Sequence, residues 1–360
     1  MFDIFLPAIT GALITGVIGF LIIVTQSWHG RWTHDHTDGV QKFHYHPTPR
    51  IGGLAIMLGL LASMFLIENI EVIRLMKPLL IGGLIPFFFG FREDVTRRVS
   101  VRDRLLATMA GAAVTITLTG TYLHRLDIPF VDIAMQWWPL AVLVTIVAVS
   151  GVTNAINILD GFNGLASGVT VISFLFMAAL AYQVGDATLM SVGLLIASVV
   201  LGFMALNYPF GKIFMGDAGA YFVGFLLAWV ALLLTVRHPN ISTWAPLLIC
   251  AYPVVEVLYS MVRRMLADHG SGNPDSLHLH SLIKTRLVRR FLPQLPLWLK
   301  NALVAPWIWL CTAVLGWVAL QVASESLVLM GLFAVFVLWY HVTYQFLLKL
   351  PVFDEAGLNE

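Results

Sequence analysis

The chain has 360 residues, of which 59% are hydrophobic and only 11% are charged. Soluble domains carry about a quarter charged residues, so this composition excludes an ordinary soluble protein and indicates an integral membrane protein. The net charge of +1 gives no sign of the basic surface that a nucleic acid requires, and we predict no nucleic-acid partner.

Apolar runs recur along the whole chain. A helix needs about 20 apolar residues to cross the hydrocarbon core of a membrane. We place eleven such runs, with centres near residues 15, 60, 82, 112, 147, 174, 197, 227, 252, 310 and 337. These runs leave no room for a soluble domain. We therefore predict an all-α polytopic membrane protein with about 11 transmembrane helices, in which residues 1–360 form one integral membrane domain.

The basic residues lie mostly on one side of this predicted topology. Of the 21 Lys and Arg residues, 17 fall in the loops after the odd-numbered spans or at the C-terminal end. Because Lys and Arg accumulate in cytoplasmic loops, we expect the N-terminus outside and the C-terminus inside. Residues 267–300 form a long cytoplasmic loop in this topology, and its basic amphipathic stretch predicts an interfacial helix against membrane lipids.

Five polar motifs follow the predicted spans 1, 3, 5, 7 and 9. In chain order they read KFHYHPTPRIGG, GFREDVTRR, NAINILDGFNGL, NYPFGKIFMGDAG and DSLHLHS. All five loops are predicted to be cytoplasmic. A transport path would place polar groups near the middle of the membrane, so the collection of these motifs at one face favours an active site on the cytoplasmic surface.

Each motif alone also has a structural interpretation. GFREDVTRR could be a solvated charge run, and the histidines of the first and last motifs could lie on the surface or bind metal adventitiously. Asp217 could cap the helix that follows it. Asn154 and Asn157 could hydrogen-bond across a helix seam, although their i, i+3 spacing also puts them on one helical face, with Asp160 one turn further along.

The combination of residue types indicates one kind of ligand. Mg²⁺ prefers oxygen ligands and commonly binds through one or two carboxylates together with substrate phosphate. Glycines and helix N-termini accept phosphate oxygens, and Arg, Lys and His side chains neutralise the remaining charge. The motifs therefore favour a diphosphate bound to a metal ion.

The same motifs resemble those of the polyprenyl-phosphate N-acetylhexosamine-1-phosphate transferases, the MraY/WecA-like glycosyltransferase family 4. The resemblance runs from about residue 42 to residue 281 and rests on five motifs in matching order. The chain departs from the family pattern at four positions: Glu93 and Asn163 stand where the family has Asp, Ala220 where it has Ser, and Ser281 where it has His. Asn163 cannot act as an acid, and Glu93 lengthens the first of two paired acids.

The resemblance implies a reaction. N-acetylhexosamine 1-phosphate would pass from a UDP-sugar to undecaprenyl phosphate with release of UMP, as the first membrane step of surface glycan synthesis. The protein would lie in the bacterial inner (plasma) membrane, with a periplasmic N-terminus, a cytoplasmic C-terminus and a cytoplasmic active site. The implied cofactor is Mg²⁺, with Mn²⁺ as a substitute.

The resemblance also implies a set of site residues. The catalytic residues would be Glu93, Asp94, Asp160, His278 and His280; the substrate-binding residues would be Lys42, His44, Arg50, Asn154, Asn163 and Asn207; and the metal ligands would be Asn157 and Asp217.

Two carboxylates have open roles. Glu93 acts either as a base toward the lipid phosphate or as a group that positions metal and phosphate. We favour positioning, because a phosphate monoester with a second pKa of about 6 is already largely ionised at neutral pH. Glu256 lies inside predicted span 9 and is either a functional carboxylate or an ion-pair partner of Arg263 or Arg264.

The function has two alternatives. One is a phospho-MurNAc-pentapeptide transferase of peptidoglycan synthesis, although the split motif HLH is typical of the branch that uses N-acetylhexosamines. The other is a polytopic transporter or a structural membrane partner in glycan assembly. A homodimer is compatible with the sequence.

Overall fold

The computed structural model describes residues 4–35, 47–266 and 277–353 of the chain. These residues are mostly helical, and their single small sheet pairs β1 (His34–Asp35) with β2 (Thr48–Pro49) in antiparallel orientation. The prediction of an all-α polytopic membrane fold is confirmed at the level of its class.

The helices follow in chain order: α1 (Phe5–Val24), α2 (Gln26–Thr33), α3 (Gly52–Met64), α4 (Ile70–Thr96), α5 (Val101–Thr119), α6 (Pro129–Met135), α7 (Trp138–Leu159), α8 (Leu165–Gln183), α9 (Ala187–Asn207), α10 (Gly216–Arg237), α11 (Trp244–Ile249), α12 (Ala251–Leu266), α13 (Leu279–Leu282), the π-helix η2 (Ile283–Val288), α14 (Arg289–Phe291), α15 (Leu297–Ala302), α16 (Val304–Gln321) and α17 (Ser326–Lys349).

Within the described ranges, eight helices are long and apolar enough to cross a membrane: α1, α4, α7, α8, α9, α10, the combined α15–α16 and α17. The other three predicted runs are helical but differ in length or composition. Helix α3 has only 13 residues, and α5 begins with charged side chains. The run near residue 252 is divided into α11 and α12, because Pro253 has no N–H for the carbonyl of Ile249. The count of eleven spans and the orientation stay predictions.

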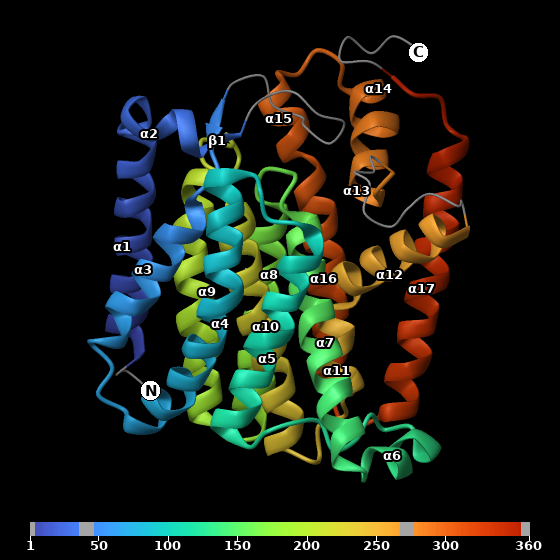
Figure 1. Ribbon diagram of the computed structural model, residues 1–360. Coiled ribbons are helices and arrows are strands. Elements are labelled where there is room, and N and C mark those ends of the chain that lie inside the picture. The colour runs from blue at the N-terminus through green and yellow to red at the C-terminus, as the bar shows by residue number, and fades with distance from the viewer. Residues whose placement is uncertain (1–3, 36–46, 267–276, 354–360) are drawn as a thin grey trace.

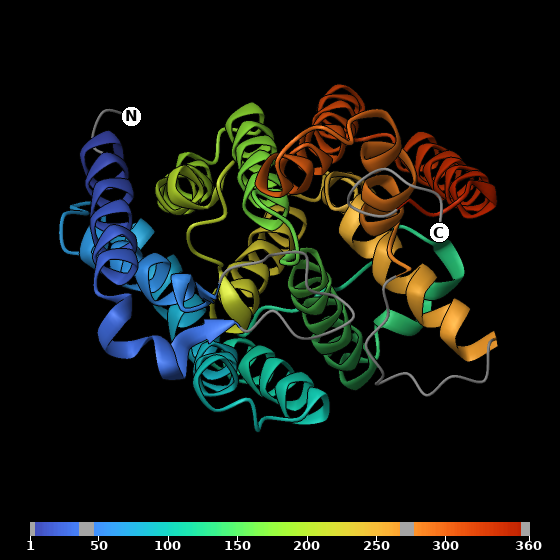
Figure 2. The same cartoon turned by 90° about the horizontal axis from the view of Figure 1, so that it is seen from above.

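Helix α10 lies at the centre of the bundle. Most of its apolar window, 89%, is buried within the protein, whereas only 17% of the window of α17 is buried. It packs against α3, α4, α7 and α8, and the view from above shows α1 and α17 on opposite sides of the molecule (Figure 2). The first turn of α10 is therefore surrounded by other elements.

The polar motifs gather at one end of the bundle. That end carries α2, β1, α13, α14 and α15, while α6 lies at the opposite end (Figure 1). The second to fifth motifs and the last residues of the first lie there, because α4, α7 and α9 end at this level and α10 begins at it. Of the predicted loop 267–300, residues 277–300 form α13, η2, α14 and part of α15; residues 267–276 lie outside the described ranges.

Candidate active site

A backbone contact brings the first and fourth motifs together. Three hydrogen bonds of 2.8–3.0 Å join residues 49–53 to residues 214–215, just before α10. The approach requires glycine, because a Cβ atom on Gly53 would lie 2.2 Å from the backbone nitrogen of Gly219. As a result, Arg50 is held beside the first turn of α10.

Two carboxylates bind the N-terminus of α10. Asp94 accepts the N–H groups of Asp217 and Ala218, each at 2.9 Å, and Asp160 accepts the N–H of Gly216 at 2.8 Å. The free amides of a helix N-terminus attract negative charge. The structure therefore differs from the interpretation in which Asp217 caps its own helix, and the Asp217 side chain is available for other partners.

Asp217 is the point on which the polar side chains converge. Its Oδ1 accepts from Asn157 Nδ2 at 3.1 Å and lies 3.5 Å from Arg50 Nη2, while Arg104 contacts its Oδ2. Arg50 also donates from Nε to Asp94 at 3.0 Å. Two guanidinium groups and two carboxylates thus form one partly buried cluster.

Arg104 was not among the residues predicted for the site. It lies in the first turn of α5, and its guanidinium is 5.9 Å from the ring of Tyr221 on α10. A signal was present in the sequence, because an arginine followed directly by a long apolar run must be held by a partner or by the membrane surface. The sequence could not show that the partner is Asp217.

The end of α7 presents three polar side chains to α10. Asn157 and Asp160 contact the first turn of α10 as described, and the Tyr221 hydroxyl donates to Asn154 Oδ1 at 3.4 Å. Burial raises the pKa of Asp160 well above its ordinary value. The predicted common face of Asn154, Asn157 and Asp160 therefore exists, and it faces the metal-ligand candidate Asp217.

The side chains of Asn163 and Asn207 hydrogen-bond to backbone groups of neighbouring segments. Asn163 Nδ2 donates to the carbonyl oxygens of Pro209 at 2.8 Å and Trp298 at 3.2 Å. Asn207 accepts the N–H of Gly164 at 2.7 Å. Both residues are buried, and they connect the third and fourth motifs. Direct contact of either residue with substrate stays a prediction.

Glu93 lies beside the cluster at Asp217, near enough for its charge to interact with Arg50 and Arg104. Its Oε2 accepts the backbone N–H of Val99 at 2.8 Å, which ties the end of α4 to the loop that follows. The neighbouring acid, Asp94, is fully buried. The two paired acids therefore differ in surroundings, and only Asp94 contacts α10.

The two histidines of the last motif lie next to the third motif. The rings of His278 and His280 are stacked with centroids 5.2 Å apart, and the ring of Phe162 lies 5.3 Å from His280. Burial lowers the pKa of His280 to about 4, so this ring is neutral near pH 7 and acts as a hydrogen-bonding group rather than a cation. Lys42 and His44 lie outside the described residues.

Comparison with known proteins identifies the family. The sequence model of glycosyl transferase family 4 matches residues 76–235. A protein of Bacillus subtilis (strain 168) named "Probable undecaprenyl-phosphate N-acetylglucosaminyl 1-phosphate transferase" is 31% identical over 241 residues, which cover 67% of this chain and 66% of that protein. An undecaprenyl-phosphate alpha-N-acetylglucosaminyl 1-phosphate transferase of Yersinia pestis is 30% identical over 249 residues, covering 68% of this chain and 67% of that protein. The chain belongs to glycosyl transferase family 4.

A decaprenyl-phosphate N-acetylglucosaminephosphotransferase of Mycobacterium leprae (strain TN) is 29% identical over 270 residues, covering 66% of each chain. This chain thus spans about two thirds of the length of these relatives. The family match at residues 76–235 includes Asp94, Arg104, Asn157, Asp160 and Asp217, which meet at α10 together with Arg50.

The donor atoms of this family 4 site suit a hard cation. Asp217 and Asn157 are oxygen-bearing side chains that touch each other, and Mg²⁺ needs only one or two protein carboxylates besides water and phosphate. A larger cluster of three or more His, Cys, Asp or Glu side chains suited to a metal is not found in residues 4–35, 47–266 and 277–353. The residues present fit Mg²⁺ bound together with a phosphate substrate.

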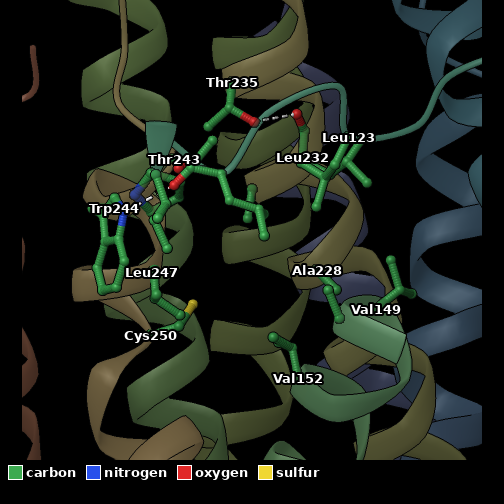
Figure 3. Close-up of a pocket in the computed structure, with 15 residues that line it drawn as sticks. Leu123, Val149, Val152, Ala228, Leu232, Thr235, Thr243, Trp244, Leu247 and Cys250 are labelled. Carbon is green, nitrogen blue, oxygen red and sulfur yellow. Dashed lines mark hydrogen bonds between the residues drawn. The ribbon is translucent and has the colours of Figure 1, made fainter. Parts of the chain in front are cut away.

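A separate apolar cavity of about 340 Å³ lies between α7, α10 and α11 (Figure 3). Its lining includes Val149, Leu232 and Trp244, and Thr235 and Thr243 are its polar members. It also touches the chain between α5 and α6, at the end of the bundle remote from Asp217. Since no charged side chain lines it, this cavity cannot bind a diphosphate, and the polar cluster remains the candidate active site.

Proposed function

We propose that this family 4 glycosyl transferase moves N-acetylhexosamine 1-phosphate from a UDP-sugar to undecaprenyl phosphate. An oxygen of the lipid phosphate attacks the phosphorus that carries the sugar, the bond between that phosphorus and the bridging oxygen breaks, and UMP leaves with the bridging oxygen and the electron pair of the broken bond. The product keeps a diphosphate between lipid and sugar. The relatives' names, which specify N-acetylglucosaminyl transfer, support N-acetylglucosamine as the sugar.

The observation that carries this proposal is the cluster at Asp217. Arg50 and Arg104 converge there with Asn157 beside the N-terminus of α10. Guanidinium groups are among the groups with which proteins bind phosphate oxygens. The cluster therefore supports a binding site for a diphosphate.

The chain's own residues address the repulsion between the two substrates. A lipid phosphate and a nucleotide diphosphate are both dianionic, and at a partly buried site their repulsion costs several kcal/mol unless cations intervene. Arg50 and Arg104 supply fixed positive charge at the place where the phosphates would meet. Asp94 holds both Arg50 and the first turn of α10, so the charges are oriented before substrate binds.

Asp217 and Asn157 would hold Mg²⁺, or Mn²⁺ in its place. The ion, when bound, would neutralise phosphate charge and polarise the phosphorus–oxygen bonds. Asn157 directs its Nδ2 to Asp217 here, and rotation of the amide by half a turn would present Oδ1 instead. Glu93 would position this region through its contact with residue 99.

Two other functions are less well supported. The HLH motif and the relatives' names favour an N-acetylhexosamine over UDP-MurNAc-pentapeptide. A transporter would need polar groups near the middle of the membrane, whereas the cluster lies at the end of the bundle where α10 begins. We further propose that this end faces the cytoplasm of a bacterial inner membrane. The proposal includes a homodimer.

The proposal is tested with the purified protein in detergent. UMP release is measured with undecaprenyl phosphate and each of a panel of UDP-sugars, with and without MgCl₂. We expect release with UDP-N-acetylglucosamine or a close epimer, and only when lipid, sugar nucleotide and metal are all present. UMP release without lipid, or none with any donor, would contradict the proposed function.

A further inference from the structure

Glu256 is a buried carboxylate on α12 that contacts the histidine motif. It is only 1% exposed. Its Oε1 lies 2.9 Å from His278 Nδ1, and its Oε2 accepts from the backbone N–H of Leu279 at 3.2 Å and from the hydroxyl of Tyr252 at 3.3 Å. Three donors thus converge on this carboxylate, which stabilises its charge. An ion pair with a nearby arginine is not needed to explain why it is buried.

These contacts determine which ring nitrogens carry a proton. An ionised carboxylate can only accept hydrogen bonds, so His278 must donate from Nδ1. The single hydroxyl proton of Tyr252 is directed to Glu256, and the same hydroxyl oxygen lies 3.2 Å from His280 Nδ1. The arrangement in which Tyr252 donates to Glu256 and accepts from His280 satisfies both contacts, and it places a proton on Nδ1 of the second ring, which also lies 3.7 Å from Glu256 Oε2.

The remaining nitrogen of each ring is left for a ligand. The two rings are nearly parallel, with an angle of 7° between their planes. Both Nδ1 atoms face the Glu256 carboxylate, at 2.9 Å for His278 and 3.7 Å for His280, so both Nε2 atoms point away from it. Within the described residues, neither Nε2 takes part in a hydrogen bond. Phe162 packs against His280 at 5.3 Å, and Phe162 follows Asp160 by two residues, so the pair lies beside the turn that contacts α10.

We propose that Glu256 is a positioning residue for the transfer reaction. It fixes Nδ1 of His278 directly and Nδ1 of His280 through Tyr252, so that both Nε2 atoms are presented to the UDP-sugar. Carboxylates hold metal-binding histidines in this way, and loss of such a partner typically costs about 10- to 100-fold in metal affinity or activity. The inference rests on the proposed function for its role in catalysis, but the geometry of the rings is testable without it.

The first experiment measures the histidine tautomers. Protein labelled with ¹⁵N-histidine gives long-range ¹H–¹⁵N spectra in which the two neutral tautomers differ, and the variants His278→Ala and His280→Ala assign the signals. We expect the Nδ1–H form for His280 and a protonated Nδ1 for His278 in the wild type. Glu256→Gln should change the ¹⁵N shifts of both rings. An Nε2–H tautomer of both rings in the wild type would overturn the proposal even if no Glu256 variant can be purified.

The second experiment measures steady-state transfer. Glu256→Gln should lower kcat/KM for the UDP-sugar by about 10- to 100-fold, and Glu256→Asp, which keeps the charge, should recover part of it. In a His278→Ala background, Glu256→Gln should lower kcat/KM much less, because the effects of two residues that act through one another are not additive. Equal losses in both backgrounds would show that Glu256 does not act through His278.

Asp186 supplies the matched control. It is a buried carboxylate that also contacts a histidine, His238, at 2.8 Å, together with Arg237 at 2.7 Å. It lies at the other end of α10, away from Asp217. Asp186→Asn should lower thermal stability without changing kcat/KM. A wild type that releases no UMP while its rings show the expected tautomers would contradict the proposed function and leave the ring geometry established.

Discussion

Asp217 is the side chain whose removal should have the clearest effect. Asp217→Ala removes the carboxylate that faces Arg50, Arg104 and Asn157. We expect UMP release to fall by about 10²- to 10³-fold or more, because preorganised charge at the reacting phosphate is lost. The wild type should also gain thermal stability on addition of MgCl₂, as any ligand of the folded state provides.

The Asp217→Ala protein should not gain thermal stability on addition of MgCl₂. Glu71→Ala is the control, since Glu71 is exposed and pairs only with the exposed Arg74 among the contacts of the described residues. An Asp217→Ala protein that still transfers sugar phosphate at the wild-type rate would rule out the assigned metal site.

Glu93 should prove to be a positioning group. Glu93→Gln keeps an oxygen that can accept the N–H of Val99, so the fold should be retained. We expect weaker apparent Mg²⁺ affinity and a defect that excess metal relieves. A general base would instead cost about 10²- to 10⁴-fold and would be relieved at high pH, where the lipid phosphate is deprotonated on its own.

The pH and Mg²⁺ dependence of kcat for Glu93→Gln distinguishes the two roles. Glu93→Asp tests the effect of the departure from the family pattern, because it restores the shorter acid that the family has at this position. Rescue of Glu93→Gln by alkali, with no response to metal concentration, would show that Glu93 is the base.

The start of α10 depends on one backbone conformation. Gly216 has φ of +72°, and a Cβ atom there would lie 1.8 Å from the carbonyl oxygen of Arg50. Gly216→Ala should therefore destabilise the protein by more than about 1 kcal/mol and should lower transfer, because the amides bound by Asp94 and Asp160 would move. Thermal unfolding and UMP release measure the two effects.

Gly151→Ala is the matched control in α7. A Cβ atom there meets nothing within 4 Å, and alanine is the better helix former. We expect unchanged transfer and equal or slightly higher stability. A loss of the same size in both variants would mean that the conformation of Gly216 is not the cause.

The two ends of the molecule should face different compartments. Thr96, the last residue of α4, and Ser324, which precedes α17, are exposed positions at opposite ends of the bundle. In a variant without Cys250 and Cys311, a cysteine at residue 324 should react with a membrane-impermeant maleimide in intact spheroplasts. A cysteine at residue 96 should react only after lysis. The reverse pattern would contradict the orientation that the 17 of 21 basic residues indicate.

Much of the molecule was predictable because its causes are local. Composition alone identifies a membrane protein, and apolar runs of helical length locate most of the long helices. The resemblance to the family motifs picks out Arg50, Asp94, Asn157, Asp160 and Asp217, and the structure brings all five together. The i, i+3 spacing of the asparagines on α7 was sufficient to predict a shared face.

Tertiary structure alone decided how these residues are paired. Asp94 rather than Asp217 caps α10, Arg104 joins the cluster from α5, and Glu256 holds the histidines of a loop more than 20 residues away. Such contacts depend on how helices pack, and packing joins residues that are distant in sequence. The sequence by itself therefore determined the membrane fold and the chemical types at the site, because hydropathy and residue type are local properties. Only the folded structure decided which donors each carboxylate binds. A buried charge needs hydrogen-bond partners, and packing determines which donors lie close enough to serve.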